Sequence, residues 1–289
     1  DWIARNGSFL HQAESLMSVM FAGGGTGGPL YPGLAIARAM HRQQSDVEVF
    51  FIGARRGIER QVLPESGFRH ELLDLHPLYR SRPWENVKTL RGGVTSWSAL
   101  NRIVHAERPD VVVGTGGYAS GAALAYAVTH GIPSVIQEQN SFPGLTTRFF
   151  SRYARQIHLG FPEAAAKLHP GKRTTVMDSG NPIEPPSEPR PDRQIARESW
   201  GFPSLGGPVL LIYGGSQGSK AINDVVAQWV VSGIPDDLYI IWATGRGTHA
   251  SYSSLENGRV RITPYLSPVY EAYAASDFAL SIGGAMATA

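Results

Sequence analysis

Three glycine-rich stretches have the residue types needed to hold an anion through main-chain groups: residues 23–28 (GGGTGG), 114–118 (GTGGY) and 214–218 (GGSQG). Glycine lets the backbone turn sharply and approach a ligand closely. A helix that begins after such a loop directs free N–H groups and the positive end of its dipole at the ligand. A tight strand–helix connection explains any one loop equally well, but three loops in two halves of the chain favour pyrophosphate binding.

The first loop formally fits the dinucleotide pattern G-x-G-x-x-G. A dinucleotide site also needs an acidic residue after the next strand, where it binds the ribose. The strand expected at residues 47–52 is followed by Gly53, Ala54 and Arg55, which argues against a dehydrogenase.

The third loop also fits G-x-S-x-G, the nucleophile elbow of α/β-hydrolases, with Ser216 as the nucleophile. Asp236 or Asp237, followed by His249, would complete a triad in the required order. A hydrolase leaves the other two glycine loops unexplained. We therefore favour Ser216 as a phosphate ligand and keep the hydrolase as a remote alternative.

Short apolar runs alternate with longer amphipathic segments along the chain, which predicts βαβ units and a parallel sheet. Strands are expected at residues 19–22, 47–52, 111–113, 134–137, 157–159, 209–213, 239–243, 260–263 and 278–282. Helices are expected between them, notably at residues 30–42, 84–107, 118–130 and 221–231. Glycine loops that follow such strands lie where open α/β sheets bind their ligands.

The proline-rich stretch at residues 180–191 interrupts this alternation and predicts a linker. We expect an N-terminal domain at residues 17–180, a linker at 181–191 and an incomplete C-terminal domain at 192–289. Residues 1–16 are expected to be a non-native or disordered extension, because Met17 directly precedes the first strand.

Composition excludes several classes of protein. The formal net charge of +2 is too small to indicate nucleic-acid binding. The chain has no cysteine, hence no disulfide and no thiolate metal site, as fits a reducing compartment. Its nine histidines lack ligand spacing and it has no Asp-x-Asp, so no metal is expected. No apolar run is long enough to span a bilayer, and we expect a soluble cytoplasmic protein, with membrane-surface contact left open.

The glycine loops and their flanking segments together resemble the MurG family of glycosyltransferases. In chain order, the matching segments are residues 24–28 with 32 and 34–37, then 116–118 with 120–121, 131–133, 138–140, 143–146, 180–182, and 214–219 with 223. Each segment is weakly specific alone, but the ordered set is highly specific. The resemblance implies an α/β fold of the GT-B glycosyltransferase type, with two Rossmann-like doubly wound domains facing a cleft.

The resemblance also implies a reaction. An inverting hexosyltransferase would move N-acetylglucosamine (GlcNAc) from UDP-GlcNAc to the C4 hydroxyl of MurNAc in undecaprenyl-pyrophosphoryl-MurNAc-pentapeptide (lipid I). The product would be lipid II, for peptidoglycan synthesis. Neither metal nor cofactor is implied, since UDP-GlcNAc is a substrate. Main-chain N–H groups of the third loop would stabilise the charge on the leaving UDP.

Site residues follow from the same resemblance. The acceptor pyrophosphate would be held by Gly24, Gly25, Thr26, Gly27, Gly28, Gly116, Gly117 and Tyr118. The donor would be held by Thr26, Gly27, Gly28, Asn140, Gly215, Ser216, Gln217, Gly218, Leu266, Gly284 and Ala285. A turn-forming side chain is the alternative for Asn140, and core packing is the alternative for Leu266. Glu138 is the candidate general base, against the alternative of a structural cap or salt bridge.

Three residues depart from the family pattern. Pro29 stands where the family has a histidine favoured for acceptor recognition or base chemistry, and proline has no titratable group and no N–H. Glu184 and Ile282 each replace an arginine. We expect the family's ribose-binding glutamate just beyond Ala289. A degenerate or truncated homologue that binds without turnover therefore stays open, as does another UDP-sugar enzyme of the GT-B type.

Residues 75–84 mix apolar and aromatic side chains with cations, which suits an anionic lipid surface. The candidate membrane patch consists of Leu75, Leu78, Tyr79, Arg80, Arg82 and Trp84. An ordinary loop with solvated charges is the alternative. With the patch, we expect a peripheral protein at the cytoplasmic face of the bacterial inner membrane.

Overall fold

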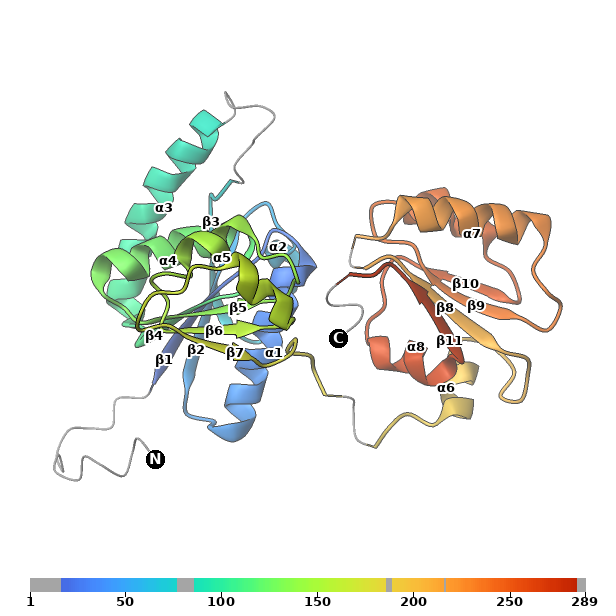
Figure 1. Cartoon of the computed structure of the whole chain (residues 1–289). Helices are drawn as coiled ribbons and strands as arrows, with labels where there is room; N and C mark the ends of the chain where they lie inside the picture. Colours follow the sequence, from blue (N-terminus) through green and yellow to red (C-terminus); the bar gives the residue numbers. More distant parts are fainter. Residues whose placement is uncertain (1–16, 77–85, 186–188, 216, 285–289) are drawn as a thin grey trace. The chain divides into compact units, whose positions relative to one another are not determined.

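The computed structural model describes residues 17–76, 86–185, 189–215 and 217–284 (Figure 1). The chain divides into two compact units, Asp1–Ile183 and Glu184–Ala289, called here the first and the second domain. The division falls inside the proline-rich stretch expected to be a linker. The expected extension at residues 1–16 lies outside the described residues.

The first domain is built on a seven-stranded parallel sheet in the order β3-β2-β1-β4-β5-β6-β7. Its strands are β1 (Ser18–Ala22), β2 (Glu48–Ala54), β3 (Arg69–Leu73), β4 (Val111–Gly114), β5 (Ser134–Glu138), β6 (Gln156–Leu159) and β7 (Thr175–Asp178). The strand order reverses between β1 and β4, so the helices that follow these two neighbouring strands pack on opposite faces of the sheet. Such a switch point is where open α/β sheets bind ligands.

Helices cover both faces of this sheet (Figure 1). They are α1 (Gly27–Gln43), α2 (Glu59–Val62), α3 (Asn86–Glu107), α4 (Gly117–His130), α5 (Leu145–Phe150) and the short 3-10 helix η3 (Pro162–Lys167). Along β1, Val19 and Phe21 join the core beneath α1, whereas Met20 and Ala22 join the core beneath α3 and α4. A strand buried on both faces needs apolar side chains at every position, which is why it reads as one continuous run.

The second domain repeats the plan on a smaller scale, with a four-stranded parallel sheet in the order β10-β9-β8-β11. Its strands are β8 (Val209–Tyr213), β9 (Tyr239–Ala243), β10 (Val260–Thr263) and β11 (Phe278–Ser281). Its helices are α6 (Arg193–Ser199), α7 (Lys220–Ser232), α8 (Val269–Ala275) and the short η4 (His249–Ser251) and η5 (Ser253–Leu255). Here the switch point lies between β8 and β11.

The strands and helices expected from the sequence are confirmed to within a few residues at their ends. The structure adds β3 and β7, which the sequence pattern missed. Both are edge strands with half-exposed side chains, so neither carries the apolar run of a buried strand. The helix expected from residue 84 is described from Asn86 onward.

Candidate functional site

All three glycine loops lie at the carboxyl ends of strands that flank a switch point. The first loop connects β1 to α1, the second connects β4 to α4, and the third connects β8 to α7. Because β1 and β4 are neighbours, the first and second loops lie side by side. Each domain thus presents main-chain N–H groups at the edge where α/β sheets bind ligands.

The helices after these loops begin with few side chains of their own to pair with the first-turn N–H groups. None of α1, α4 and α7 has an acidic residue in its first turn. The N-cap residues Thr26 and Gly116 make no side-chain cap, and Ser219 accepts from the N–H of Ile222 at a long 3.4 Å. The first-turn N–H groups and the helix dipoles can therefore act on an external anion.

The two glycine loops of the first domain contact each other through main chain. The N–H of Gly24 donates to the carbonyl oxygen of Gly116 at 3.4 Å. A Cβ on Gly117 would collide with the carbonyl oxygen of Gly24, and one on Gly25 would lie 2.6 Å from Cε1 of Tyr118. Gly24, Gly25 and Gly117 have φ of +153°, +93° and +74°, which favours glycine. The predicted acceptor residues thus form one joined surface.

Glu138, the candidate base, holds a loop of its own segment. Its side chain is buried, and Oε1 accepts from the main-chain N–H and the Nδ2 of Asn140 at 3.0 and 2.8 Å. Oε2 accepts from the N–H of Gly144, the N-cap of α5, at 3.1 Å. The geometry therefore favours the structural cap over the base, since both oxygens are committed to the loop. The same bond favours the turn-forming role for the Asn140 side chain.

Two polar residues that sequence reasoning left without a role connect this loop to its neighbours. Asn181 donates through Nδ2 to the carbonyl oxygen of Gln139 at 3.1 Å, and its Oδ1 accepts from Gln137 at 3.4 Å. Gln139 in turn donates through Nε2 to the carbonyl oxygen of Thr115 at 2.6 Å. The segments 138–140 and 180–182 were recognisable as motifs, but only the fold shows that they touch.

The third loop is positioned by a buried amide. Asn223 on α7 donates to the carbonyl oxygen of Thr244 at 2.8 Å and accepts from Nε1 of Trp242 at 3.0 Å. A Cβ on Gly218 would collide with that same carbonyl oxygen of Thr244. Asn223 and Gly218 therefore fix the loop against the end of β9.

The donor candidates of the second domain lie beyond the carboxyl ends of the strands in its sheet. A Cβ on Gly215 would lie 4.0 Å from Cδ1 of Ile282, the residue after β11. Gln217 is exposed and Gly284 is half-buried. Leu266 packs against the core beneath α6 and α8, as its alternative interpretation expected. Two candidates lie outside the described residues: Ser216 and Ala285.

The residues proposed to complete a hydrolase triad are not brought together. Asp236 and Asp237 precede the amino end of β9, whereas His249 follows its carboxyl end. A strand of five residues spans about 16 Å. Asp236 instead pairs with Arg259 at 3.6 Å. This separation rules out the hydrolase alternative.

Pro29 lies in the first turn of α1, where proline is tolerated because its N–H would have no partner within the helix. A Cβ on Gly116 would lie 3.9 Å from its Cγ. The departure from the family therefore adjoins both glycine loops of the first domain and brings no proton-transfer group there. Glu184, the second departure, is exposed.

The expectation that Leu75 faces a membrane is wrong. Its side chain is 5 % exposed and belongs to the core beneath α3 and α4, so it is not available to a surface. The rest of the predicted patch lies outside the described residues: Leu78, Tyr79, Arg80, Arg82 and Trp84.

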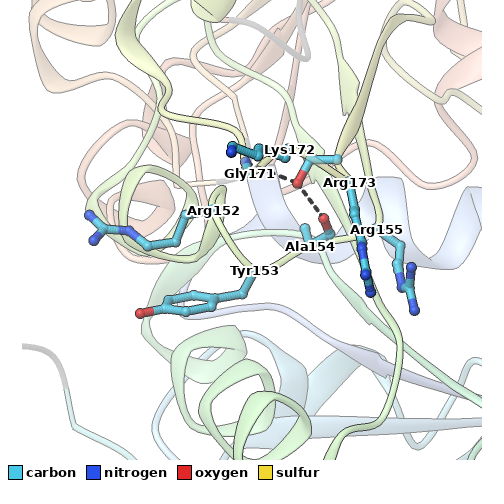
Figure 2. A pocket seen from close by; sticks show the side chains of 8 residues that line it. Arg152, Tyr153, Ala154, Arg155, Gly171, Lys172 and Arg173 are labelled. Carbon is cyan, nitrogen blue, oxygen red and sulfur yellow. Dashed lines mark hydrogen bonds between the residues drawn. The ribbon is translucent and has the colours of Figure 1, made fainter.

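A hollow of about 330 Å³ lies at the amino-terminal ends of β6 and β7. The first two glycine loops follow the opposite, carboxyl ends of strands in this sheet. Figure 2 shows the side chains of Arg155 and Arg173 on one side of the hollow and those of Arg152 and Tyr153 on the other. None of the glycine loops lines this hollow, so it is separate from the candidate site.

Metal ligands do not gather in the part of the chain that is described. No group of three or more histidine, aspartate or glutamate residues there could hold a metal ion. Over the same residues, none of the helices is both long and apolar enough to cross a membrane.

Comparison with known proteins agrees with this arrangement. The N-terminal domain of glycosyltransferase family 28 matches residues 19–159, and the C-terminal domain of that family matches residues 209–289. Among solved structures, MurG of Acinetobacter baumannii aligns with a TM-score of 0.58 at 23 % identity, over 94 % of this chain and 73 % of that one. At that identity the alignment supports the fold.

Sequence relatives are more specific. A UDP-N-acetylglucosamine–N-acetylmuramyl-(pentapeptide) pyrophosphoryl-undecaprenol N-acetylglucosamine transferase of Chlorobium phaeobacteroides is 39 % identical, over 93 % of this chain and 74 % of its own length. The enzyme of the same name from Prosthecochloris aestuarii is 38 % identical over the same shares. With both domains of a GT-B glycosyltransferase present, the chain belongs to glycosyltransferase family 28 and, within it, to the MurG family of N-acetylglucosamine transferases.

Proposed function

We propose that this chain transfers GlcNAc from UDP-GlcNAc to the C4 hydroxyl of MurNAc in lipid I, with inversion, to give lipid II. The observation that carries the proposal is the repeated arrangement of a glycine loop at a switch point followed by a helix whose first turn contains no acidic residue. Two such loops adjoin in the first domain and one lies in the second, which matches a pyrophosphate acceptor and a diphosphate donor.

In this proposal the second domain binds the donor. The main-chain N–H groups at residues 215–218 and the start of α7 face the diphosphate of UDP-GlcNAc. As the glycosidic bond to UDP breaks, negative charge builds up on the diphosphate, and fixed N–H dipoles stabilise that charge without reorganising. The reaction then proceeds without a metal or cofactor, so chelation by EDTA should leave the rate unchanged.

The first domain binds the acceptor pyrophosphate at the joined surface of residues 24–28 and 116–118. The acceptor C4 hydroxyl must lose a proton as it attacks the anomeric carbon of GlcNAc. Neither Pro29 nor Glu138 is suited to take that proton: proline has no basic group, and the carboxylate of Glu138 is occupied by its own loop.

The test is transfer of labelled GlcNAc from UDP-GlcNAc to a short-chain lipid I analogue by this chain and by its Pro29→His variant. Turnover by the parent chain establishes the transferase and shows that a histidine at position 29 is dispensable. Turnover by the variant alone identifies a chain that binds substrates without transfer. If neither the parent chain nor the variant turns over although both bind UDP-GlcNAc and the lipid I analogue, the chain likewise binds its substrates without transfer. Failure to bind UDP-GlcNAc contradicts the proposal.

We also propose that the first domain docks on an anionic membrane surface, as a peripheral protein at the cytoplasmic face of the inner membrane. Around α5, four large apolar side chains are exposed: Phe142, Leu145, Phe149 and Tyr153. Cations lie over two of the aromatic rings: Cζ of Arg148 is 5.2 Å from the ring centre of Phe142, and Cζ of Arg152 is 5.7 Å from that of Phe149. The basic hollow in Figure 2 adjoins this surface through Arg152 and Tyr153.

Apolar rings partition into the interface while each nearby cation contributes about 1 kcal/mol at an anionic surface. The test is co-sedimentation with vesicles of phosphatidylcholine with and without phosphatidylglycerol. We expect binding that needs the anionic lipid, weakens with salt, and falls at least fivefold in a Phe149→Ser/Tyr153→Ser variant. A Leu205→Ser variant, which alters an exposed apolar residue of the second domain, serves as the control. Equal binding by the double variant contradicts the docking surface.

A further inference from the structure

Glu59 is a fully buried carboxylate in the segment that follows β2, the strand beside β1. It is the first residue of α2 and is 0 % exposed. Its Oε1 accepts from the main-chain N–H of Gly25 at 2.8 Å and from that of Ala54 at 3.1 Å. One side chain thus joins the first glycine loop to the end of β2.

Three glycines leave room for this carboxylate. A Cβ on Gly24 or on Gly57 would collide with its oxygens, and one on Gly53 would lie 2.8 Å from its Cβ. Gly24 and residues 53–57, which are far apart in sequence, therefore both pack closely around one side chain. Because Glu59 is contacted from several sides, it fixes the position of the first loop.

The contact also decides which main-chain donors are available to a ligand. Because the N–H of Gly25 is used by Glu59, the donors left for an anion are those further along, at the start of α1. The first loop contacts the second through Gly24 and Gly117. Loss of the bond between Gly25 and Glu59 would therefore displace the whole surface assigned to the acceptor.

The other carboxylate oxygen of Glu59, Oε2, is buried without a hydrogen-bond partner among the described residues, and no ion pair to Glu59 is found there. A buried carboxylate is costly when it is incompletely paired. Because a residue that served only to fill the core would be apolar, a polar side chain at this position indicates a requirement for the bonds that Oε1 makes.

We propose that Glu59 is a positioning residue for acceptor binding: it sets the first glycine loop so that the start of α1 and the second loop together face the acceptor pyrophosphate. The inference rests on the acceptor assignment of the proposed function. Glu59 touches no substrate and acts through Gly25.

Three variants separate the oxygen acceptor, its reach and its charge. Glu59→Ala removes the acceptor, Glu59→Asp keeps the charge but is one methylene too short to reach Gly25, and Glu59→Gln keeps an oxygen at the same reach. Glu48→Gln, at the exposed start of β2, is the matched control for loss of one carboxylate. All are made in the whole chain, with thermal unfolding to confirm folding.

The first readout, hydrogen exchange of the peptide covering residues 20–30, needs no ligand. The second is calorimetric binding of a short-chain lipid I analogue and, separately, of UDP-GlcNAc. For Glu59→Ala and Glu59→Asp we expect at least tenfold faster exchange and at least tenfold weaker acceptor binding, with the Kd for UDP-GlcNAc changed less than twofold. Glu59→Gln should stay within threefold of the parent chain on every measure, as should Glu48→Gln.

Acceptor binding by Glu59→Asp at the parent's affinity overturns the inference, as does equal weakening of both ligands. If Glu59→Ala does not fold, Glu59→Asp decides alone. If the parent chain binds no acceptor, the acceptor assignment is refuted, and the inference with it. Faster hydrogen exchange in the Glu59 variants would in that case still show that Glu59 holds the first loop.

Discussion

The carbonyl oxygen of Gly24 occupies the space that a Cβ on Gly117 would need, so the two glycine loops of the first domain meet main chain to main chain at this point. Gly117 also has φ of +74°. We expect Gly117→Ala to destabilise the first domain by about 2 kcal/mol or more, because the methyl group has no space and the conformation disfavours a side chain. Urea unfolding measures the change.

Gly93 on α3 is the matched control. It is exposed in a helix, and a Cβ there would have no heavy atom within 4 Å. Gly93→Ala should therefore raise the free energy of unfolding by about 0.5–1 kcal/mol. If the two substitutions change the free energy of unfolding in the same direction and by the same amount, the main-chain contact between the loops does not contribute to stability as described.

Asn223 provides the corresponding test in the second domain. Asn223→Ala leaves Nε1 of Trp242 and the carbonyl oxygen of Thr244 buried with one fewer partner each. We expect a loss of about 2–4 kcal/mol in the free energy of unfolding and at least tenfold weaker UDP-GlcNAc binding. Val225→Ala, at an exposed position of the same helix, should change both by little. Unchanged donor affinity in Asn223→Ala would show that this amide does not position the third loop.

Glu138→Gln distinguishes loop positioning from base catalysis. The amide retains one oxygen but places a donor against another donor, at either Gly144 or Asn140. We expect a lower melting temperature and slower transfer at every pH, with the acidic limb of the pH–rate profile unchanged. Loss of that limb in the variant would instead identify Glu138 as the base.

We expect His158 on β6 to make the stability of the first domain sensitive to acid. Burial lowers the pKa of its imidazole, and Nδ1 lies 2.9 Å from Oγ of Ser179. Above an unfolded pKa of about 6.5 neither state binds the proton. As the pH falls below that value, the unfolded state protonates first, so the stability contributed by the neutral ring is lost progressively until the pH has passed the lower, folded pKa.

The expected result is a smaller loss of stability between pH 7 and pH 5 in His158→Gln than in the parent chain, measured by chemical unfolding. Between pH 7 and pH 9 the two curves should run parallel. Parallel curves over the acidic range as well would mean that the folded environment of His158 does not disfavour its charged form.

The fold class, the glycine loops and the family could all be predicted from local patterns in the sequence. Central strands such as β1 and β8 are buried on both faces of a parallel sheet, so their apolar runs are visible without any partner. The loops are equally local, because a sharp turn before a helix requires glycine at the turn itself. The family followed because these local signals recur in a fixed order along the chain.

The side chains that support the glycine loops became evident only in the folded chain. The edge strands β3 and β7 gave no apolar run, and Leu75 proved to belong to the core rather than to a surface. Glu59 reaches Gly25 across 34 residues of sequence, and Asn181 reaches Gln139 across 42. A side chain's partners depend on which segments the sheet order brings together, and no local pattern around Glu59 or Asn181 contains that information.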